Sequence, residues 1–327
     1  MTNTRNRDIL STRLRLFAGE QIMPTPPHIR LGFAVRIVGR PGLGAGGPAH
    51  LSLALVRLGD VLGYLEHIGV QFYRIRPDLI TPQTLDQLEE CSLQLDLLAA
   101  RLAHTGIRLT SHMDHGVALG CTDMAQATAS LAAIEATAAL LERLDAHRPA
   151  GSIEGTLVVH VGASPTDPAG LDRFATRFMM LSARARARLA VEHESAGFSL
   201  GQLLILHQHC GVPVVFDMLH WELFNPEAIP LSLALGLALA TWPVAIRPEV
   251  HLSSPRSEAH LVPAQAHQPG RVLPPRPGQH ADFIEAAALQ RLLVAARVLP
   301  AFDLMLEAKA GDLALLRLRH DMAARWL

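Results

Sequence analysis

Eight short runs of β-forming residues alternate with longer stretches of helical pattern along most of this chain, and that alternation constrains its fold most. Strands that alternate with helices predict a parallel sheet, because a helix returns the chain to the start of the next parallel strand. A length of 327 residues suits a closed (β/α)8 TIM barrel of this α/β class. The predicted strands cover residues 30–35, 72–75, 107–111, 155–161, 189–193, 212–217, 249–252 and 302–307.

The pattern assigns residues 29–327 to one barrel domain and residues 1–28 to an N-terminal extension, which we expect to be flexible. Residues 253–279 lack periodicity and are rich in proline, arginine and histidine, so we expect an active-site loop there, with a disordered insertion as the alternative. Residues 230–246 are the most apolar, but polar and proline interruptions favour a buried helix over a membrane span. Further helices are predicted at residues 51–67, 85–104, 124–144, 200–210 and 283–298.

Six predicted strands end in histidine, aspartate or glutamate. The carboxyl ends of barrel strands converge on one face, so these side chains are expected to gather there. Imidazole and carboxylate groups together suit zinc, manganese or iron, and several carboxylates can share two or three divalent ions. Taken singly, each residue has another explanation as a satisfied polar group, a helix cap or an ion-pair partner. The strand-end residues are His112, His160, Glu192, Asp217, His251 and Glu307.

Two further histidines are candidates for another ion. His220 lies three residues beyond Asp217, and His280 lies in the last irregular segment, where His260 and His267 are alternatives to it. The formal net charge of −1 does not indicate a nucleic-acid binder, although local positive charge would suffice for a DNA groove. The three cysteines show no metal-binding spacing, which is typical of a reduced cytoplasmic protein. We expect a cytoplasmic monomer that does not enter a membrane.

From residue 29 to about residue 311 the sequence resembles the UV damage endonucleases, metal-dependent TIM barrels related to endonuclease IV. The resemblance lies in the order and spacing of several short segments along the barrel. They include Phe72-Tyr73-Arg74-Ile75, Arg108-Leu109-Thr110-Ser111-His112, Leu157-Val158-Val159-His160, Val215-Phe216-Asp217 with His220, Val250-His251-Leu252-Ser253, and Met305-Leu306-Glu307-Ala308-Lys309.

The resemblance implies an enzyme that nicks damaged double-stranded DNA on the 5′ side of a photoproduct through a metal-activated water. It implies that His112, His160 and Glu192 hold one ion. Glu192, Asp217, His251 and Glu307 would hold a second and supply the catalytic groups, and His220 and His280 would help to hold a third. Manganese is the typical metal, with zinc as the alternative. The implied DNA contacts are His115, Arg74 and Phe33.

The chain departs from the family pattern where damage is recognised. The family's glutamine-aromatic pair after the first histidine is replaced in the run His112-Met113-Asp114-His115-Gly116, and its tyrosine near the first strand is Phe33. A lysine two residues before the seventh-strand histidine, modified in the family, is Glu249 here, and the Asn-Asp after the bridging carboxylate is His193-Glu194. No histidine matches a further family histidine near Thr81-Pro82.

These departures leave two other functions open. The first is a related barrel enzyme, a sugar isomerase or epimerase of the xylose-isomerase type or a small-molecule phosphohydrolase, because fold does not fix function. The second is a degenerate family member that binds metal or a partner without turnover. An endonuclease would need a basic rim around the metal face, for which the candidates are Arg40, Arg74, Arg76, Arg256 and Arg271.

Overall fold

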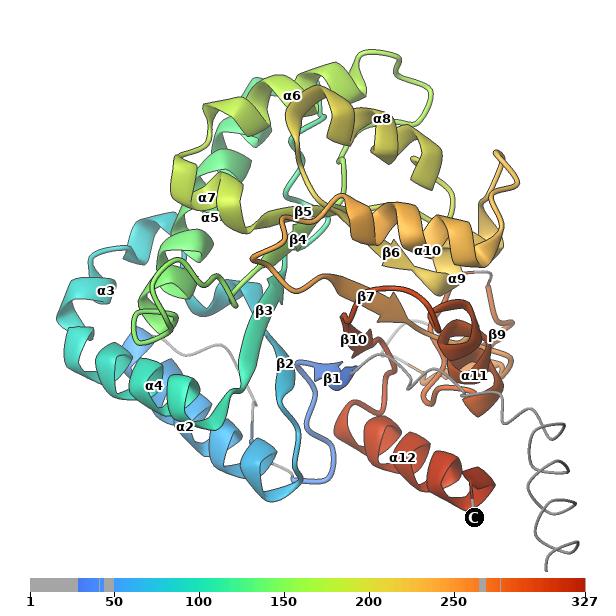
Figure 1. The fold of residues 1–327 in the computed structure, drawn as a ribbon, viewed down its shortest axis with the longest axis horizontal. Coiled ribbons are helices and arrows are strands. Elements are labelled where there is room, and N and C mark those ends of the chain that lie inside the picture. Colours follow the sequence, from blue (N-terminus) through green and yellow to red (C-terminus); the bar gives the residue numbers. More distant parts are fainter. Residues whose placement is uncertain (1–28, 41, 44–49, 265–268, 277, 327) are drawn as a thin grey trace, which may run out of the picture.

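A closed barrel of eight parallel strands, surrounded by helices, forms the body of the protein in the computed structural model (Figure 1). The structure describes residues 29–40, 42–43, 50–264, 269–276 and 278–326, so the predicted extension at 1–28 lies outside the described residues. The order around the barrel is β1-β10-β7-β6-β5-β4-β3-β2, which confirms the predicted fold class. The barrel strands are β1 (Arg30–Ala34), β2 (Phe72–Ile75), β3 (Arg108–His112), β4 (Leu157–Val159), β5 (Leu189–Glu192), β6 (Val214–Asp217), β7 (Glu249–Leu252) and β10 (Asp303–Leu306).

Helices connect successive strands and cover the outside of the barrel (Figure 1). α8 shows how the sequence fixes their ends. The Ser199 side chain and Gln202 form a reciprocal capping box at its start, and Gly211 ends it with a φ of +78°. The helices are α2 (Leu51–His67), α3 (Gln87–Glu90), α4 (Ser92–Thr105), α5 (Met124–Leu144), α6 (Gly170–Met180), α7 (Ala183–Arg188), α8 (Leu200–Cys210), α9 (Met218–Leu223), α10 (Leu231–Ala240), α11 (Ala286–Ala295) and α12 (Asp312–Trp326), with short 3-10 turns η1 (Pro77–Leu79) and η2 (Pro82–Thr84).

Polar side chains, rather than an apolar core alone, line the barrel axis. Successive strand residues face opposite sides of a sheet, so Val250 and Leu252 of β7 can pack outward while Glu249 and His251 turn inward. Neighbouring strands bring partners alongside, because His251 is in register with Asp217 of β6 and with Met305 of β10. Alternation along each strand therefore carries charged groups into the centre of the barrel.

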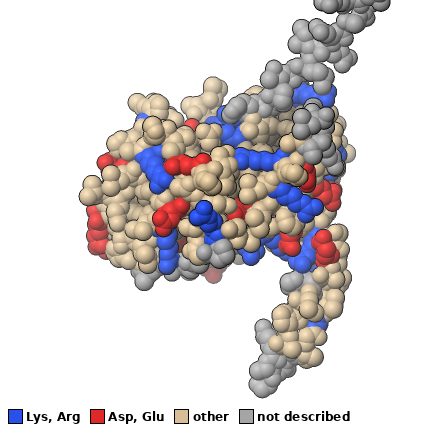
Figure 2. Space-filling model, turned by 90° about the horizontal axis from the view of Figure 1, so that it is seen from below, with Lys and Arg blue, Asp and Glu red and all other residues tan. Residues whose placement is uncertain are grey.

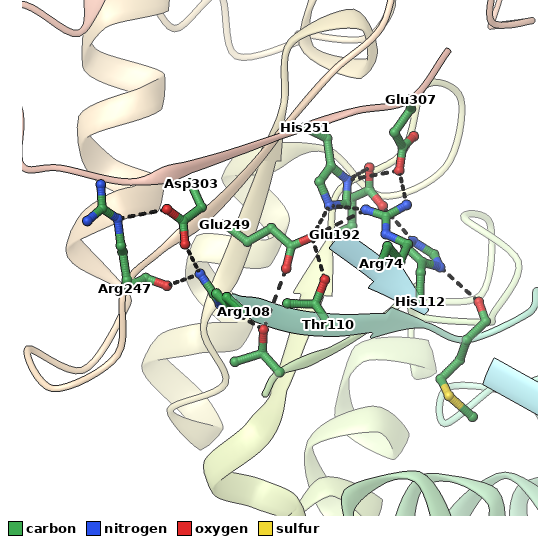
Figure 3. Close-up of polar contacts among 12 residues, drawn as sticks. Arg74, Arg108, Thr110, His112, Glu192, Arg247, Glu249, His251, Asp303 and Glu307 are labelled. Carbon is green, nitrogen blue, oxygen red and sulfur yellow. Dashed lines mark hydrogen bonds and ion pairs between the residues drawn. The ribbon is translucent and has the colours of Figure 1, made fainter. Parts of the chain in front are cut away.

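A buried ion-pair network lies in the amino-terminal half of the barrel, and Figure 3 shows the part of it formed by Asp303, Arg108 and Arg247. Asp303 is fully buried and accepts hydrogen bonds from Arg30 at 2.7 and 2.6 Å and from Arg108 at 2.7 Å. Arg247 lies 2.8 Å from the Asp303 oxygen that Arg108 does not contact. Several guanidinium groups on one carboxylate satisfy its lone pairs, and they bind β1, β3 and β10 together from the inside.

The segment after β7 differs from the prediction of a loop or a disordered insertion. It contains an antiparallel pair, β8 (His260–Val262) and β9 (Arg271–Leu273), whose residues Leu261 and Val272 face each other in register and are exposed. The predicted helix at 85–104 is also divided, with a break between α3 and α4 at Cys91. Cys91, Cys121 and Cys210 are free thiols.

Two apolar helices are relevant to whether any part of the chain could cross a membrane. The apolar stretch at 230–246 contains the short helix α10, which confirms the predicted helix, but only one face of it is buried and Leu233 and Leu237 are exposed. Among the described residues, α5 alone has the length and apolar composition of a membrane-crossing helix, but half of its most apolar stretch is buried inside the fold. A core helix of a barrel has the same properties, so α5 is weak evidence for a span.

Candidate metal centre

The six strand-end residues converge at the carboxyl end of the barrel, as the sequence predicts. Their donor atoms fall into two clusters, in each of which the atoms lie within 4.8 Å of one another. Both clusters adjoin a cavity of about 620 Å³, whose wall includes His220 and His280. Glu192 belongs to both clusters. The first consists of His112, His160 and Glu192, and the second of Glu192, Asp217, His251 and Glu307.

Glu192 joins the two clusters through its two oxygens. One oxygen lies 2.9 Å from Nε2 of His112 and 3.8 Å from Nε2 of His160. The other lies 2.9 Å from Nδ1 of His251 and 3.4 Å from Nδ1 of His220. Burial opposes ionisation of Glu192, but His251 and His112 outweigh it and hold the pKa of the carboxyl well below its usual value. An ionised carboxylate with one oxygen for each cluster is suited to bridge two cations.

Backbone carbonyls orient two of the imidazoles toward the cavity. The Nδ1–H of His112 donates to the Met113 carbonyl at 2.9 Å, and that of His220 donates to the His193 carbonyl at 2.8 Å. A ring that donates through Nδ1 keeps the lone pair on Nε2, as ligating histidines do. Burial lowers the pKa of His160 to about 4, so this ring is neutral at physiological pH. Neutral rings of this kind can act as metal ligands.

Asp217 provides a direct test of whether the residues fit a cation. Its Oδ1 accepts from the His220 backbone N–H at 2.7 Å and caps α9, whereas its buried Oδ2 has no hydrogen-bond partner among the described residues. Burial, together with the charges of Glu192 and Glu307, raises the pKa of Asp217. A buried carboxylate oxygen without a partner is costly unless something positive meets it. The donor set therefore fits a divalent cation in the second cluster.

A second layer of charged groups lies directly beneath these residues (Figure 3). Arg74 forms ion pairs with Glu307 and, at 3.3 Å, with Glu249, and its Nη2 lies 2.6 Å from Nε2 of His251. Burial opposes charge on Glu249, but His251 and Arg74 lower its pKa to about 2. Burial also opposes charge on His251, whose pKa Glu192 and Glu307 raise to about 10. A cation at Nδ1 of His251 would therefore compete with a proton.

The residues predicted to contact DNA fall into different environments. His115 is exposed and stacks on His160 with ring centroids 5.0 Å apart, so a contact with DNA through His115 remains a prediction. Arg74 is only 6% exposed and lies at the floor of the cavity, which corrects its assignment to the rim. Phe33 is fully buried and packs edge-on against Tyr73, so its side chain cannot reach DNA. Arg74 points toward the barrel axis, whereas Phe33, in register with Tyr73 and Leu306, packs on the opposite face of the sheet.

The other predicted rim arginines also differ in position. Arg256 is half-buried and Arg271 is exposed, both on the segment between β7 and α11. Arg40 lies over the Tyr64 ring beside a separate cavity, and Arg76 pairs with Asp78 at the surface. Acidic and basic groups alternate over the face shown in Figure 2, with no continuous basic field on it. The five predicted rim arginines are therefore scattered over different parts of the fold.

Three features of the site were not predicted from the sequence. His193 is fully buried, and its Nε2 accepts from the Asp217 backbone N–H at 3.1 Å. Gly162, just beyond β4, has a φ of +68°, and a Cβ there would lie 2.3 Å from the Cα of Ala118. His280 pairs with Pro255 across an isolated antiparallel bridge, so the segment that contains β8 and β9 begins and returns beside the cavity. His267 lies outside the described residues.

Comparisons with known proteins agree with this geometry. The model of the UV-endonuclease UvdE family matches residues 52–325. A UV DNA damage endonuclease of Bacillus velezensis is 28% identical over 169 residues, which are 51% of this chain and 48% of that protein. A second, from Bacillus pumilus, is 31% identical over 175 residues, 52% of this chain and 49% of that protein. The chain thus spans about half the length of the curated relatives that it matches.

Solved structures show the same barrel. The crystal structure of SacUVDE aligns with a TM-score of 0.75 at 22% identity over 92% of this chain and 100% of that chain. Endonuclease IV from Thermus thermophilus aligns with a TM-score of 0.52 at 16% identity, over 90% of this chain and 99% of that chain. At these identities the likeness concerns the fold alone. The family match covers most of the chain, and on that ground the chain belongs to the UV-endonuclease UvdE family.

Proposed function

We propose that this protein is a metal-dependent endonuclease that nicks damaged double-stranded DNA on the 5′ side of UV photoproducts, acting as a monomer. Family membership supports this reaction, since the family description and the names of the relatives specify a UV damage endonuclease. One observation carries the proposal for this chain: two clusters of imidazole and carboxylate donors share the buried Glu192 at the mouth of the barrel.

The donor set also supports the choice of metal. It contains nitrogen and oxygen ligands without cysteine, which favours manganese and allows zinc. Two such ions would activate a water and stabilise the leaving oxygen of a phosphodiester. His112, His160 and Glu192 would hold one ion, and Asp217, His251 and Glu307 would join Glu192 to hold the other. His220 and His280 line the same cavity and would help to hold a third.

Two basic residues on the cavity wall are suited to bind the DNA backbone. Arg36 and Lys309, the only lysine of the chain, both line the cavity that contains the metal ligands. Positive side chains at the mouth would bind phosphate groups and bring the scissile bond over Glu192. His115 would add a planar surface beside them. We assign the contact with DNA to this wall of the cavity, which Arg74 also lines, in place of the buried Phe33.

A nicking assay tests the proposal. Supercoiled plasmid, irradiated with UV or untreated, is incubated with protein and manganese, and the relaxed product is measured on a gel. Wild type is expected to nick irradiated plasmid, and Glu192→Gln is expected not to nick it. Glu154→Gln is the matched control, because Glu154 pairs with Arg30 at 3.2 Å in the amino-terminal half of the barrel. Equal nicking of both plasmids would refute lesion recognition, and equal nicking by Glu192→Gln would refute the site.

One observation favours a second candidate function. The cavity of about 620 Å³ is of the size that small-molecule sites have, which suits a sugar isomerase, an epimerase or a small phosphohydrolase. Metal-dependent turnover of ketoses or sugar phosphates, with no nicking of irradiated plasmid, would favour this function. Tight metal binding without turnover of either kind of substrate would identify a degenerate family member.

A further inference from the structure

His251 lies between two groups with opposite demands on its Nε2 (Figure 3). One favours a proton on this nitrogen, and the other favours a lone pair there. Its Nε2 is 3.2 Å from a carboxylate oxygen of Glu249, which can only accept a hydrogen bond. The same nitrogen is 2.6 Å from Nη2 of Arg74, which can only donate one. Its Nδ1 faces Glu192 at 2.9 Å, on the side of the second cluster.

A cation must displace one proton from His251, and the position of the proton that remains decides whether the ring can hold that cation. If Nε2 carries the proton and donates it to Glu249, Nδ1 presents a lone pair to the cluster of Glu192, Asp217 and Glu307. If Nε2 instead accepts from Arg74, Nδ1 carries the proton and donates it to Glu192. Only the first arrangement supplies a ligand, because a metal ion needs the lone pair.

We propose that Glu249 is a positioning residue that holds His251 in the cation-binding tautomer, and that Arg74 opposes it. The balance between them sets the metal affinity of the second cluster. This inference rests on the metal centre of the proposed function. It assigns a role to the position where the family resemblance implies a lysine.

The surroundings of Glu249 suit this role. The carboxylate is fully buried, and the hydroxyls of Thr110 and Thr156 donate to its two oxygens, each at 3.5 Å. These hydroxyls come from β3 and from the residue just before β4, so the carboxylate is held from two directions. A carboxylate fixed in this way can orient the ring of a ligating histidine, as outer carboxylates do in many metal sites.

The contacts of Arg74 explain why it would oppose metal binding. Its Nη1 donates to Glu307, a ligand candidate of the same cluster, while its Nη2 approaches His251. The guanidinium therefore engages two of the four residues that the cation would use. It has no comparable contact with His112 or His160 among the described residues, so its effect should be restricted to the second cluster.

Calorimetric titration with manganese tests the proposal on four purified proteins: wild type, Glu249→Gln, Glu249→Asp and Arg74→Gln. Glu249→Gln is expected to weaken one binding event by about 10- to 100-fold and to leave the other unchanged. Glu249→Asp keeps the charge but withdraws the oxygen from Nε2, so it should show a similar loss at the same event. Arg74→Gln should strengthen that event. Glu154→Gln is the control and should bind as wild type does.

The aspartate variant separates positioning from charge. If charge alone mattered, Glu249→Asp would bind as wild type does, and that result would overturn the proposal. A loss shared equally by both binding events would overturn it too. The visible spectrum of bound cobalt gives a second readout, and it should change in both Glu249 variants at equal occupancy. Circular dichroism in chelator establishes folding, and if Glu249→Gln is unfolded, Glu249→Asp decides the question.

Failure of the proposed function can be distinguished from failure of this inference about Glu249. If wild type binds no manganese, the metal centre itself is refuted. If wild type binds manganese and both Glu249 variants match it, the metal centre stands and only the role of Glu249 is lost.

Discussion

Asp217→Asn should separate metal binding from folding, because the two oxygens of Asp217 have different roles. Oδ1 caps α9, and an asparagine oxygen can accept the same hydrogen bond. Oδ2 is buried without a partner, and burial raises the pKa of the carboxyl. A raised pKa means that the ionised group costs stability above that pKa, so replacing it with a neutral amide removes this cost. The variant should lose a ligand but keep the fold.

The magnitudes follow from linkage between binding and unfolding. In chelator the variant should lie within about 1 kcal/mol of wild type, since the cap remains and one buried polar group without a partner replaces another. At a manganese concentration of about 100 times Kd, wild type gains about 2.7 kcal/mol. A variant that binds about 100-fold more weakly gains about 0.4 kcal/mol at the same concentration. The difference of about 2.3 kcal/mol corresponds to about 3 °C in Tm for a chain of this size.

Differential scanning fluorimetry with chelator and with manganese measures both quantities. Wild type and Asp217→Asn should melt together in chelator and separate by about 3 °C in manganese. A variant that loses more than about 2 kcal/mol in chelator would show that Asp217 is structural. A variant with the full manganese shift would show that Asp217 is not a ligand. Either result would refute the argument that the buried Oδ2 of Asp217 has no partner because it is a metal ligand.

Three further predictions concern the rest of the fold. Asp303→Asn should destabilise the protein by about 3–5 kcal/mol with or without metal, measured by urea unfolding, because it leaves buried guanidiniums uncompensated; a loss below about 1 kcal/mol would contradict this. Gly162→Ala should cost more than about 2 kcal/mol, since it adds a clash to left-handed backbone strain. Gly211 also has a positive φ, +78°, but a Cβ added there would have no atom near it. Gly211→Ala is therefore a control without a clash, and it should cost clearly less stability than Gly162→Ala. Burial lowers the pKa of His193 to about 3, so stability should fall as pH drops from about 6.5 toward 3, by up to about 1.4 kcal/mol per unit. His193→Gln should show a shallower loss, and an unchanged slope would exclude His193 as the cause.

The eight barrel strands can be predicted from the sequence because each is a short apolar run, and six of them end at a chemically distinctive residue. Asp217 and Glu307 illustrate this, since nothing in an apolar strand requires a carboxylate at its end. The convergence of these ends follows from barrel topology alone, and the two clusters confirm it. The assignment of particular ions to particular residues stays a prediction.

Other features depend on contacts that no local pattern reveals. The antiparallel pair β8–β9 exposes Leu261 and Val272, so it has little alternation of buried and exposed residues to detect. The burial of Arg74 follows from strand alternation, which a search for surface arginines overlooks. The partners of Arg74 lie on β7 and just after β10, more than a hundred residues away, and only the closed barrel brings them together.

The separation of the ligands along the chain has a consequence for biosynthesis. His112 ends the third barrel strand, whereas Glu307 follows β10, which closes the barrel by pairing with β1. A nascent chain that has not yet released β10 from the ribosome lacks one wall of the second cluster. If the proposed metal centre exists, the second cluster could be loaded only after synthesis of the last strand, and incomplete translation products would lack it.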